Sequence, residues 1–166
     1  MRTDLLSRYF TRALPTPYPK NNPTQYGLYS RSLPCFTNIY KEWYQKKDGI
    51  RIQKVPTLAY LKKHFREVSL AHWIMNDGYW DGTVILCTES FSKKEVECLM
   101  KLLYSKYGLK SATQKRSKET KFLGGVRLRF SGKKENIEKL ISLVLPHMHP
   151  KMTYKFGPYK TKQSSF

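Results

Sequence analysis

The sequence predicts an α+β fold, in which helices pack against an antiparallel sheet. Three observations lead to this class. Apolar residues recur at helical spacing in several segments, short β-branched or alternating segments lie between them, and Gly or Pro stands at the junctions. From residue 67 onward the predicted order of elements is α-β-α-β-β-α, which is typical of an α+β unit.

The first part of the chain is basic and rich in proline, and residues 1–24 are expected to form an N-terminal extension. Apolar residues that fit one face of a short helix precede the prolines: Leu5, Leu6, Tyr9 and Phe10. An acid-poor amphipathic start with Arg and Ser is typical of a mitochondrial targeting peptide. An ordinary surface helix followed by an irregular loop has the same composition, and the sequence leaves both interpretations open.

A strand and then a helix are predicted after the extension. The strand covers Gln25–Arg31, where aromatic residues alternate about Gly27. The helix covers Pro34–Gln45, because proline fits the first helical turn and an apolar stripe follows it. The same strand–helix order recurs at Gly125–Phe130 and Glu135–Leu145, which indicates a partial earlier copy of the same unit.

The second half contains regular elements with clear boundaries. Ser92 and Glu95 form a capping box that begins a helix, and Gly108 ends it. In the last predicted strand, Arg127 and Arg129 alternate with apolar residues and are expected on the face away from the helices. The other predicted elements are a turn at 46–49, a helical segment at Thr57–His64, a helix beginning near Glu67, a strand at Thr83–Thr88, a hairpin of Leu109–Gln114 with Gly125–Phe130, and a helix at Glu135–Leu145.

The composition is strongly basic, because 31 Lys and Arg residues oppose 12 Asp and Glu residues and give a formal net charge of +19 at pH 7. With 40% hydrophobic and 14% aromatic residues the chain can form a core, which excludes a wholly disordered protein. No apolar run approaches the roughly 20 residues of a membrane span. Three widely spaced cysteines argue against a disulfide scaffold and a structural zinc site. Such a surface favours a polyanionic partner, with nucleic acid ahead of a membrane.

The segment SLAHWIMNDG at residues 69–78 resembles the signature helix of the LAGLIDADG homing endonucleases, in a form common in organellar group I introns. Downstream, LCTESFSKKEVECL, LLYSKYGLK and LPHMHPKMTYKF resemble the same branch, and upstream YSRSLPCFTNIYKEWY resembles the end of a first repeat. The likeness covers about residues 25–156. It implies a basic extension (1–24), a remnant of a first repeat (25–66), a complete repeat with a saddle-shaped antiparallel sheet (67–156) and a basic tail (157–166).

The resemblance also implies a catalytic site built from two such helices, each contributing one acidic residue that holds Mg²⁺ against the scissile phosphates. In this chain the implied metal carboxylate is Asp77, and Gly78 allows the sharp turn from helix to sheet. Lys155 matches the active-site lysine, which polarises water or stabilises charge on phosphate. Glu89 lies where relatives carry a polar residue near the water network. An isolated Asp-Gly pair would otherwise indicate only a turn.

The chain departs from the family pattern in ways that bear on activity. Asn76 stands where relatives often carry Asp, and His72 stands where the namesake motif has Gly. If Leu28 is the first-repeat equivalent of Leu128, the acid of that repeat falls before Met1. We therefore expect one metal carboxylate where the chemistry of the family needs two.

Two groups of basic residues are candidates for nucleic-acid contact. Arg127 and Arg129 lie on the strand face that members of the family lay into the DNA major groove. The hairpin connection adds further cations: Lys115, Arg116, Lys118 and Lys121. A solvated loop and an ordinary exposed strand face are the alternatives, and the net charge of the chain favours nucleic-acid contact.

We therefore expect a nucleic-acid-binding protein that derives from a homing endonuclease and is deficient in cleavage. Its partner would be nucleic acid, with structured RNA ahead of duplex DNA, and not a membrane. The protein would act as an intron maturase or within a larger ribonucleoprotein such as an organellar ribosome. The alternative is a site-specific DNA endonuclease that uses Mg²⁺ and is active only when paired with a second motif-bearing chain. A mitochondrial or other organellar location fits both.

Overall fold

The computed structural model describes residues 9–11, 15–115 and 125–159. The chain divides into two compact units, Met1–Tyr44 and Gln45–Phe166, and each is described by itself. In the first unit, β1 (Thr16–Tyr18) and β2 (Gln25–Gly27) form an antiparallel pair. The strand predicted at Gln25–Arg31 ends earlier, at Gly27, and the proline-rich extension, for which an irregular loop was one of two interpretations, contains a strand. Proline is tolerated in β1 because a two-stranded ribbon consists of edge strands.

The helix of the first unit, α1 (Pro34–Trp43), begins at the predicted residue and ends earlier than predicted. It ends at Trp43 because Tyr44 already has extended backbone angles, with φ −135° and ψ 148°. The apolar stripe predicted from the sequence is present, but no residue of α1 is buried, and Phe36, Ile39 and Tyr40 are exposed.

The second unit begins at the second residue of a hairpin, which is followed by two helices. These elements are β3 (Tyr44–Lys47), β4 (Ile50–Gln53), α2 (Leu58–His64) and α3 (Glu67–Asp77). The turn predicted at residues 46–49 is confirmed at Asp48 and Gly49, which have positive φ angles, whereas the two strands that it joins were not predicted. Thr57 caps α2, because its hydroxyl accepts a hydrogen bond from the backbone N–H of Tyr60.

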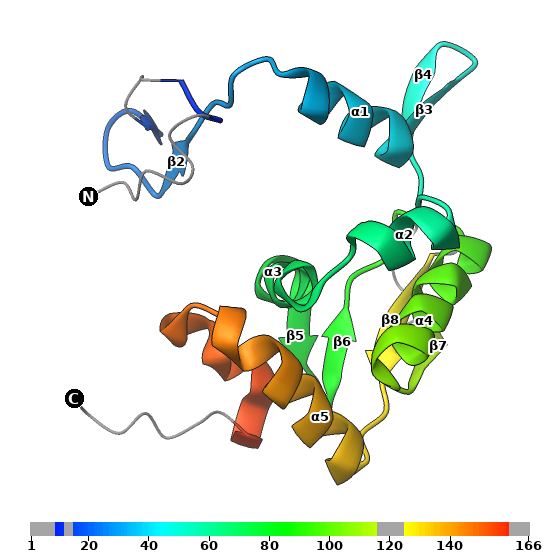
Figure 1. Cartoon of the computed structure of the whole chain (residues 1–166). Helices are drawn as coiled ribbons and strands as arrows, with labels where there is room; N and C mark the ends of the chain where they lie inside the picture. Colours follow the sequence, from blue (N-terminus) through cyan, green and yellow to red (C-terminus); the bar gives the residue numbers. More distant parts are fainter. Residues whose placement is uncertain (1–8, 12–14, 116–124, 160–166) are drawn as a thin grey trace. The chain divides into compact units, whose positions relative to one another are not determined.

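A sheet of four antiparallel strands in the order β5-β6-β8-β7 forms the centre of this unit (Figure 1). The strands are β5 (Gly78–Trp80), β6 (Val84–Leu86), β7 (Ser111–Lys115) and β8 (Val126–Phe130). The predicted order of elements is wrong by one strand, since β5 and β6 both lie between α3 and the next helix. β5 escapes the sequence pattern because it has only three residues and follows α3 without a loop.

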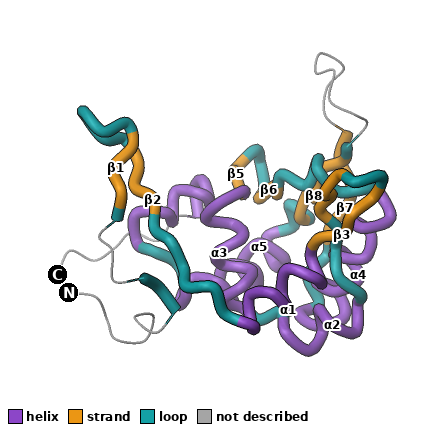
Figure 2. The backbone as a smooth tube through the Cα atoms, turned by 90° about the horizontal axis from the view of Figure 1, so that it is seen from above, coloured by secondary structure: helices purple, strands orange, loops and turns teal. Residues whose placement is uncertain are grey.

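Helices lie on one side of the four-stranded sheet, and in the described part of the second unit no helix lies over its other side (Figure 2). The remaining helical elements are α4 (Lys93–Tyr107), α5 (Lys134–Val144) and two 3₁₀ segments, η1 (Leu145–His147) and η2 (Pro150–Tyr159). Both predicted ends of α4 are confirmed. Ser92 and Glu95 bond each other's backbone N–H, and Gly108 adopts the left-handed conformation with φ 65°.

The core lies between the sheet and its helices. Val126, Leu128 and Phe130 of β8 are at most 6% exposed and face the helices, as the alternation predicts. All buried apolar side chains of the described residues fall between Pro56 and Phe156. Among the described residues, no helix combines the length and the apolar character that a membrane span requires.

Candidate nucleic-acid and metal site

Asp77 is the last residue of α3, and its side chain is exposed. The helix is held in place from the other side, where Leu70, Ala71 and Ile74 are fully buried. Gly78 begins β5 immediately, and a Cβ atom there would lie 2.5 Å from the carbonyl oxygen of Ile74. Only glycine therefore allows the chain to leave the helix at this point and places the Asp77 carboxylate at the edge of the sheet.

The structure brings Lys155 to Gly78, the residue that follows Asp77, although 77 residues separate the two. Lys155 lies in η2, and its Nζ donates a hydrogen bond of 2.6 Å to the carbonyl oxygen of Gly78. Packing of η2 against β5 fixes this position, because Trp80 and Tyr159 have ring centroids 5.8 Å apart. One carboxylate and one ammonium group thus lie on adjoining segments at the end of α3.

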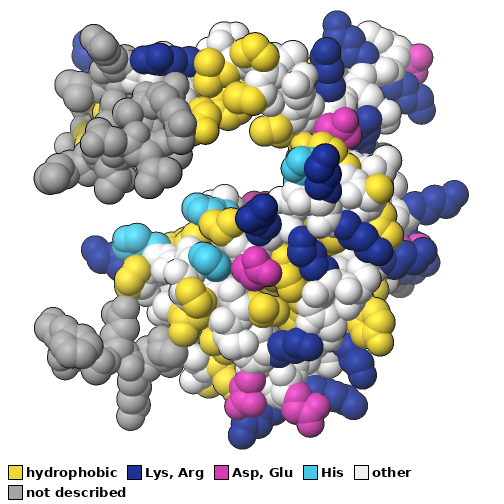
Figure 3. Space-filling view, in the orientation of Figure 1, with side chains coloured by type: hydrophobic (Ala, Val, Ile, Leu, Met, Phe, Trp, Pro, Cys, Tyr) yellow, Lys and Arg dark blue, Asp and Glu magenta, His cyan; other side chains and the backbone are white. Residues whose placement is uncertain are grey.

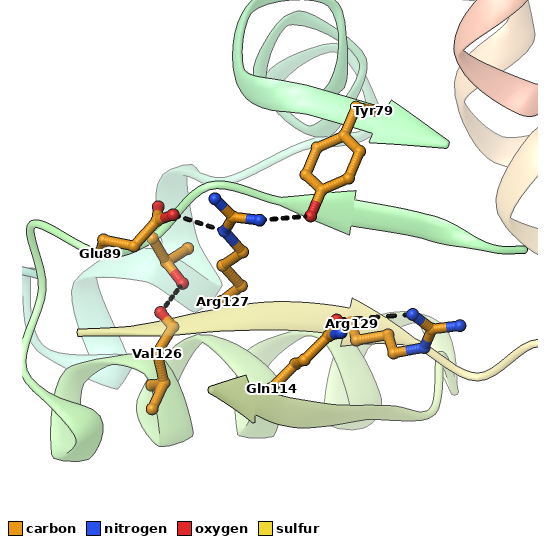
Figure 4. Close-up of polar contacts among 7 residues, drawn as sticks. Tyr79, Glu89, Gln114, Val126, Arg127 and Arg129 are labelled. Carbon is orange, nitrogen blue, oxygen red and sulfur yellow. Dashed lines mark hydrogen bonds and ion pairs between the residues drawn. The ribbon is translucent and has the colours of Figure 1, made fainter. Parts of the chain in front are cut away.

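Arg127 extends from β8 across the open face of the sheet to two partners (Figure 4). Its Nε donates a hydrogen bond to Oε1 of Glu89 within an ion pair, and its Nη1 donates to the hydroxyl of Tyr79 over 2.7 Å. The guanidinium carbon is 5.4 Å from the centroid of the Tyr79 ring. The hydrogen bond to Glu89 raises the pKa of Arg127 despite the opposing effect of burial. The guanidinium of Arg127 is therefore fixed in position by its hydrogen bonds to Glu89 and Tyr79.

Arg129 lies on the same face and is held more loosely. Its Nη2 donates to the carbonyl oxygen of Asp81 over 3.0 Å, and its Nη1 is 3.7 Å from Oδ2 of the same residue. Nη1 also donates to Gln114 over 3.4 Å. The Asp81 side chain is 66% exposed, so water screens this ion pair strongly.

The cations predicted in the hairpin connection lie partly outside the described residues. Lys115 is exposed at the end of β7, while Arg116, Lys118 and Lys121 lie outside the described residues. Sequence reasoning missed Tyr79 and Asp81, which contact the arginines. Their position immediately after the Asp-Gly turn was the available signal. Within the described ranges, no three His, Cys, Asp or Glu side chains come together as a complete metal site would require.

The site and the fold define a class: a basic α+β protein with a helix-end carboxylate beside a sheet face that carries arginines. The chain belongs to the LAGLIDADG DNA endonuclease family, whose family model matches residues 5–140. The resemblance expected from the motif at residues 69–78 is thereby confirmed, as is the α+β fold class.

Several known proteins are similar to this chain. It is 34% identical over 134 residues to the intron-encoded endonuclease ai4 of Dictyostelium discoideum, covering 80% of this chain and 77% of the relative. It is 32% identical over 133 residues to a probable intron-encoded DNA endonuclease of Mycosarcoma maydis, with 78% of this chain and 91% of the relative covered. It is 37% identical over 130 residues to the cytochrome b mRNA maturase bI2 of Saccharomyces cerevisiae, covering 75% of this chain and 28% of the relative.

A solved structure has the same fold. The homing endonuclease I-WcaI, bound to its DNA recognition sequence, superposes with a TM-score of 0.62 at 25% identity. The match covers 86% of this chain and 63% of the I-WcaI chain. This chain therefore spans less than two thirds of the solved endonuclease and about a quarter of the yeast maturase.

Proposed function

We propose that this chain binds nucleic acid through the open face of its sheet and that, by itself, it does not cut both strands of duplex DNA. The observation that supports this function is the single helix-end carboxylate of the described residues, Asp77, beside the two arginines of the open face. Binding needs only the cations and the shape of the face. Cleavage of two strands in this family needs a second carboxylate.

Asp77 fits one ligand position of a magnesium ion. Its exposed carboxylate supplies the hard oxygen donor that Mg²⁺ prefers, and Mg²⁺ is commonly held by one or two carboxylates together with phosphate oxygens. When bound, such an ion polarises a phosphate and lowers the pKa of a bound water. Lys155, fixed on the neighbouring carbonyl of Gly78, would offset negative charge on the same phosphate.

We favour structured RNA as the partner, with the chain acting as an intron maturase or as a constituent of an organellar ribosome. The maturase relative supports an RNA partner, and the net charge of +19 supports binding to a phosphate backbone. Lys and Arg side chains are also spread over the face of the second unit drawn in Figure 3. Lys62 and Lys63 of α2 and Lys106 of α4 are exposed. An origin in an organelle, mitochondrial or other, accords with relatives that are intron-encoded.

The test measures binding and cutting by the purified chain. We expect tight binding to a group I intron RNA with an affinity that falls steeply as salt rises, and no double-strand cut in plasmid DNA with Mg²⁺. A Mg²⁺-dependent double-strand cut that disappears in Asp77→Asn would contradict the proposal. Asp48→Asn makes the same charge change in the exposed β3–β4 turn and serves as the matched control.

The second candidate function is an endonuclease that is completed by another motif-bearing chain. It is favoured by the outward face of α3, where Val68, His72 and Asn76 form an exposed stripe at helical spacing. If two copies pair through this stripe, the cutting rate should rise with the square of protein concentration, and His72→Glu should abolish both the cutting and the dimer seen by sedimentation.

A further inference from the structure

The two arginines of the open face differ in how much of their charge remains available. The side chains of Arg127 and Glu89 are only 21% and 22% exposed, and they are joined by a charge-assisted hydrogen bond. Arg129 faces a carboxylate that is farther away and mostly in water. Arg127 with Glu89 therefore presents almost no net charge to a ligand, whereas Arg129 still acts largely as a cation.

The remaining donors of Arg127 are fixed in direction. A guanidinium carries five N–H donors, and Nε and Nη1 each use one, on Glu89 and Tyr79. Among the described residues, Nη2 has no hydrogen-bond partner and Nη1 donates only to Tyr79, so three N–H groups, one on Nη1 and two on Nη2, are available to a ligand. Figure 4 shows the guanidinium held between the Glu89 carboxylate and the Tyr79 hydroxyl, which prevents it from turning freely.

A guanidinium whose charge is compensated by a carboxylate binds a phosphate less favourably than it binds a base edge. Phosphate contacts draw their affinity from net positive charge, and the nearby Glu89 carboxylate would repel a phosphate anion. The acceptors of a base edge carry no net charge and are not repelled. Two parallel N–H donors, one from each of two neighbouring guanidinium nitrogens, match the O6 and N7 atoms of guanine in the commonest specific contact that arginine makes. With Nε occupied by Glu89, Nη1 and Nη2 are the pair that would supply them.

We infer that Glu89 is a positioning residue, which together with Tyr79 fixes Arg127 as a specific contact to a guanine edge. Arg129 then supplies phosphate affinity without sequence preference. This assignment gives Glu89 a role different from the place in the catalytic water network that the family resemblance implies. It rests on the proposed nucleic-acid-binding function.

The experiment selects bound sequences from randomised duplex DNA and randomised RNA pools, and then measures affinities over a salt series. We expect the wild-type chain to enrich a guanine at one position. Arg127→Lys and Glu89→Gln should lose that enrichment, and discrimination against the other bases there should fall roughly tenfold. Tyr79→Phe keeps the ring and removes the hydroxyl, so it should lose part of the discrimination.

The affinity for unselected nucleic acid and its salt dependence distinguish a positioning role of Glu89 from a general structural role. Glu89→Gln should bind unselected nucleic acid more tightly, because Arg127 becomes an uncompensated cation. Its plot of log K against log salt on duplex DNA should steepen by about 0.9. Arg129→Gln should weaken binding to all sequences alike. Glu97→Gln removes the same charge from the exposed surface of α4, where Glu97 pairs with Lys93, and should change neither preference nor slope.

The outcomes are distinct. An unchanged guanine preference in both Glu89→Gln and Tyr79→Phe, or uniformly weaker binding by Glu89→Gln, overturns the inference and leaves the proposed function standing. Absence of binding by the wild-type chain to either pool overturns the proposed function itself. Circular dichroism verifies that each variant is folded, and if Glu89→Gln is not, Tyr79→Phe decides.

Discussion

Gly157 shows how a single residue without a side chain positions the candidate site. Its backbone has a φ of 54°, and a Cβ atom there would lie 2.5 Å from the indole ring of Trp80. The close contact sets η2 against β5, and Lys155 reaches the carbonyl oxygen of Gly78 from this segment. The position of the lysine therefore depends on a residue that contributes no functional group.

Gly157→Ala should destabilise the fold by roughly 2–4 kcal/mol, because the new methyl group meets the indole and the backbone conformation becomes strained. Gly49→Ala is the control, since Gly49 also has a positive φ, of 77°, but nothing lies within 4 Å of its Cβ position. That variant should lose only about 1–2 kcal/mol. Urea unfolding of both compares them, and equal losses would mean that the contact with Trp80 contributes nothing.

At the scale of elements, Glu95 joins the start of α4 to the segment before α2. Its carboxylate accepts hydrogen bonds from the backbone N–H of Val55 over 2.8 Å and from Ser92. Burial by itself raises the pKa of Glu95, but the hydrogen bonds from Ser92 and Val55 outweigh it and lower the pKa below 4.5. The ionised carboxylate is thus favoured by folding.

The sign of the pH dependence follows from this lowered pKa. A carboxyl group whose pKa falls on folding contributes stability above its unfolded value, and this contribution is lost as pH falls through the folded value. Glu95→Gln should therefore be less stable than wild type at pH 7, and the difference should shrink below about pH 4.5. Urea unfolding from pH 3 to 7 measures it. A difference that stays constant over this range would contradict the assignment.

The elements also indicate what the sequence can predict. The ends of α4 were predictable because the capping box and Gly108 lie within the segment that they define. β5 was not, since its strand conformation comes from pairing with β6 and not from its own residues. Asp77 and Lys155 were proposed together only through the family motif. The pairing of Arg127 with Glu89 depends on side-chain directions across 38 residues, which no local pattern contains.

At the scale of the whole molecule, stability and charge are distributed differently. Every buried apolar side chain of the described residues lies in the second unit, between Pro56 and Phe156. α1 of the first unit buries none of its residues. Folding of the second unit therefore draws on its own core, while basic residues occur in both units.

The fragment Gln45–Phe166 should accordingly fold on its own. We expect a cooperative thermal transition with a midpoint within about 4 °C of the full chain, because deleting the first unit removes no described core contact. Differential scanning calorimetry of both proteins measures this. A fragment without a cooperative transition would mean that the first unit completes the core.

The open face of the sheet affects what can be inferred from the arginines that related proteins retain. Ile85 lies on this face between its cross-strand neighbours Tyr79 and Arg129, and it is fully buried although none of the described helices of the second unit covers this face. The side chains that would meet nucleic acid are therefore also the cross-strand neighbours of a buried apolar residue, and such neighbours pack over one another on a sheet face. Selection for solubility alone would retain them after binding had been lost. Arginines that are retained in related chains therefore do not show that nucleic-acid binding is retained. Asp77 is exposed and ends its helix, so its replacement costs the fold little and can indicate that activity has been lost.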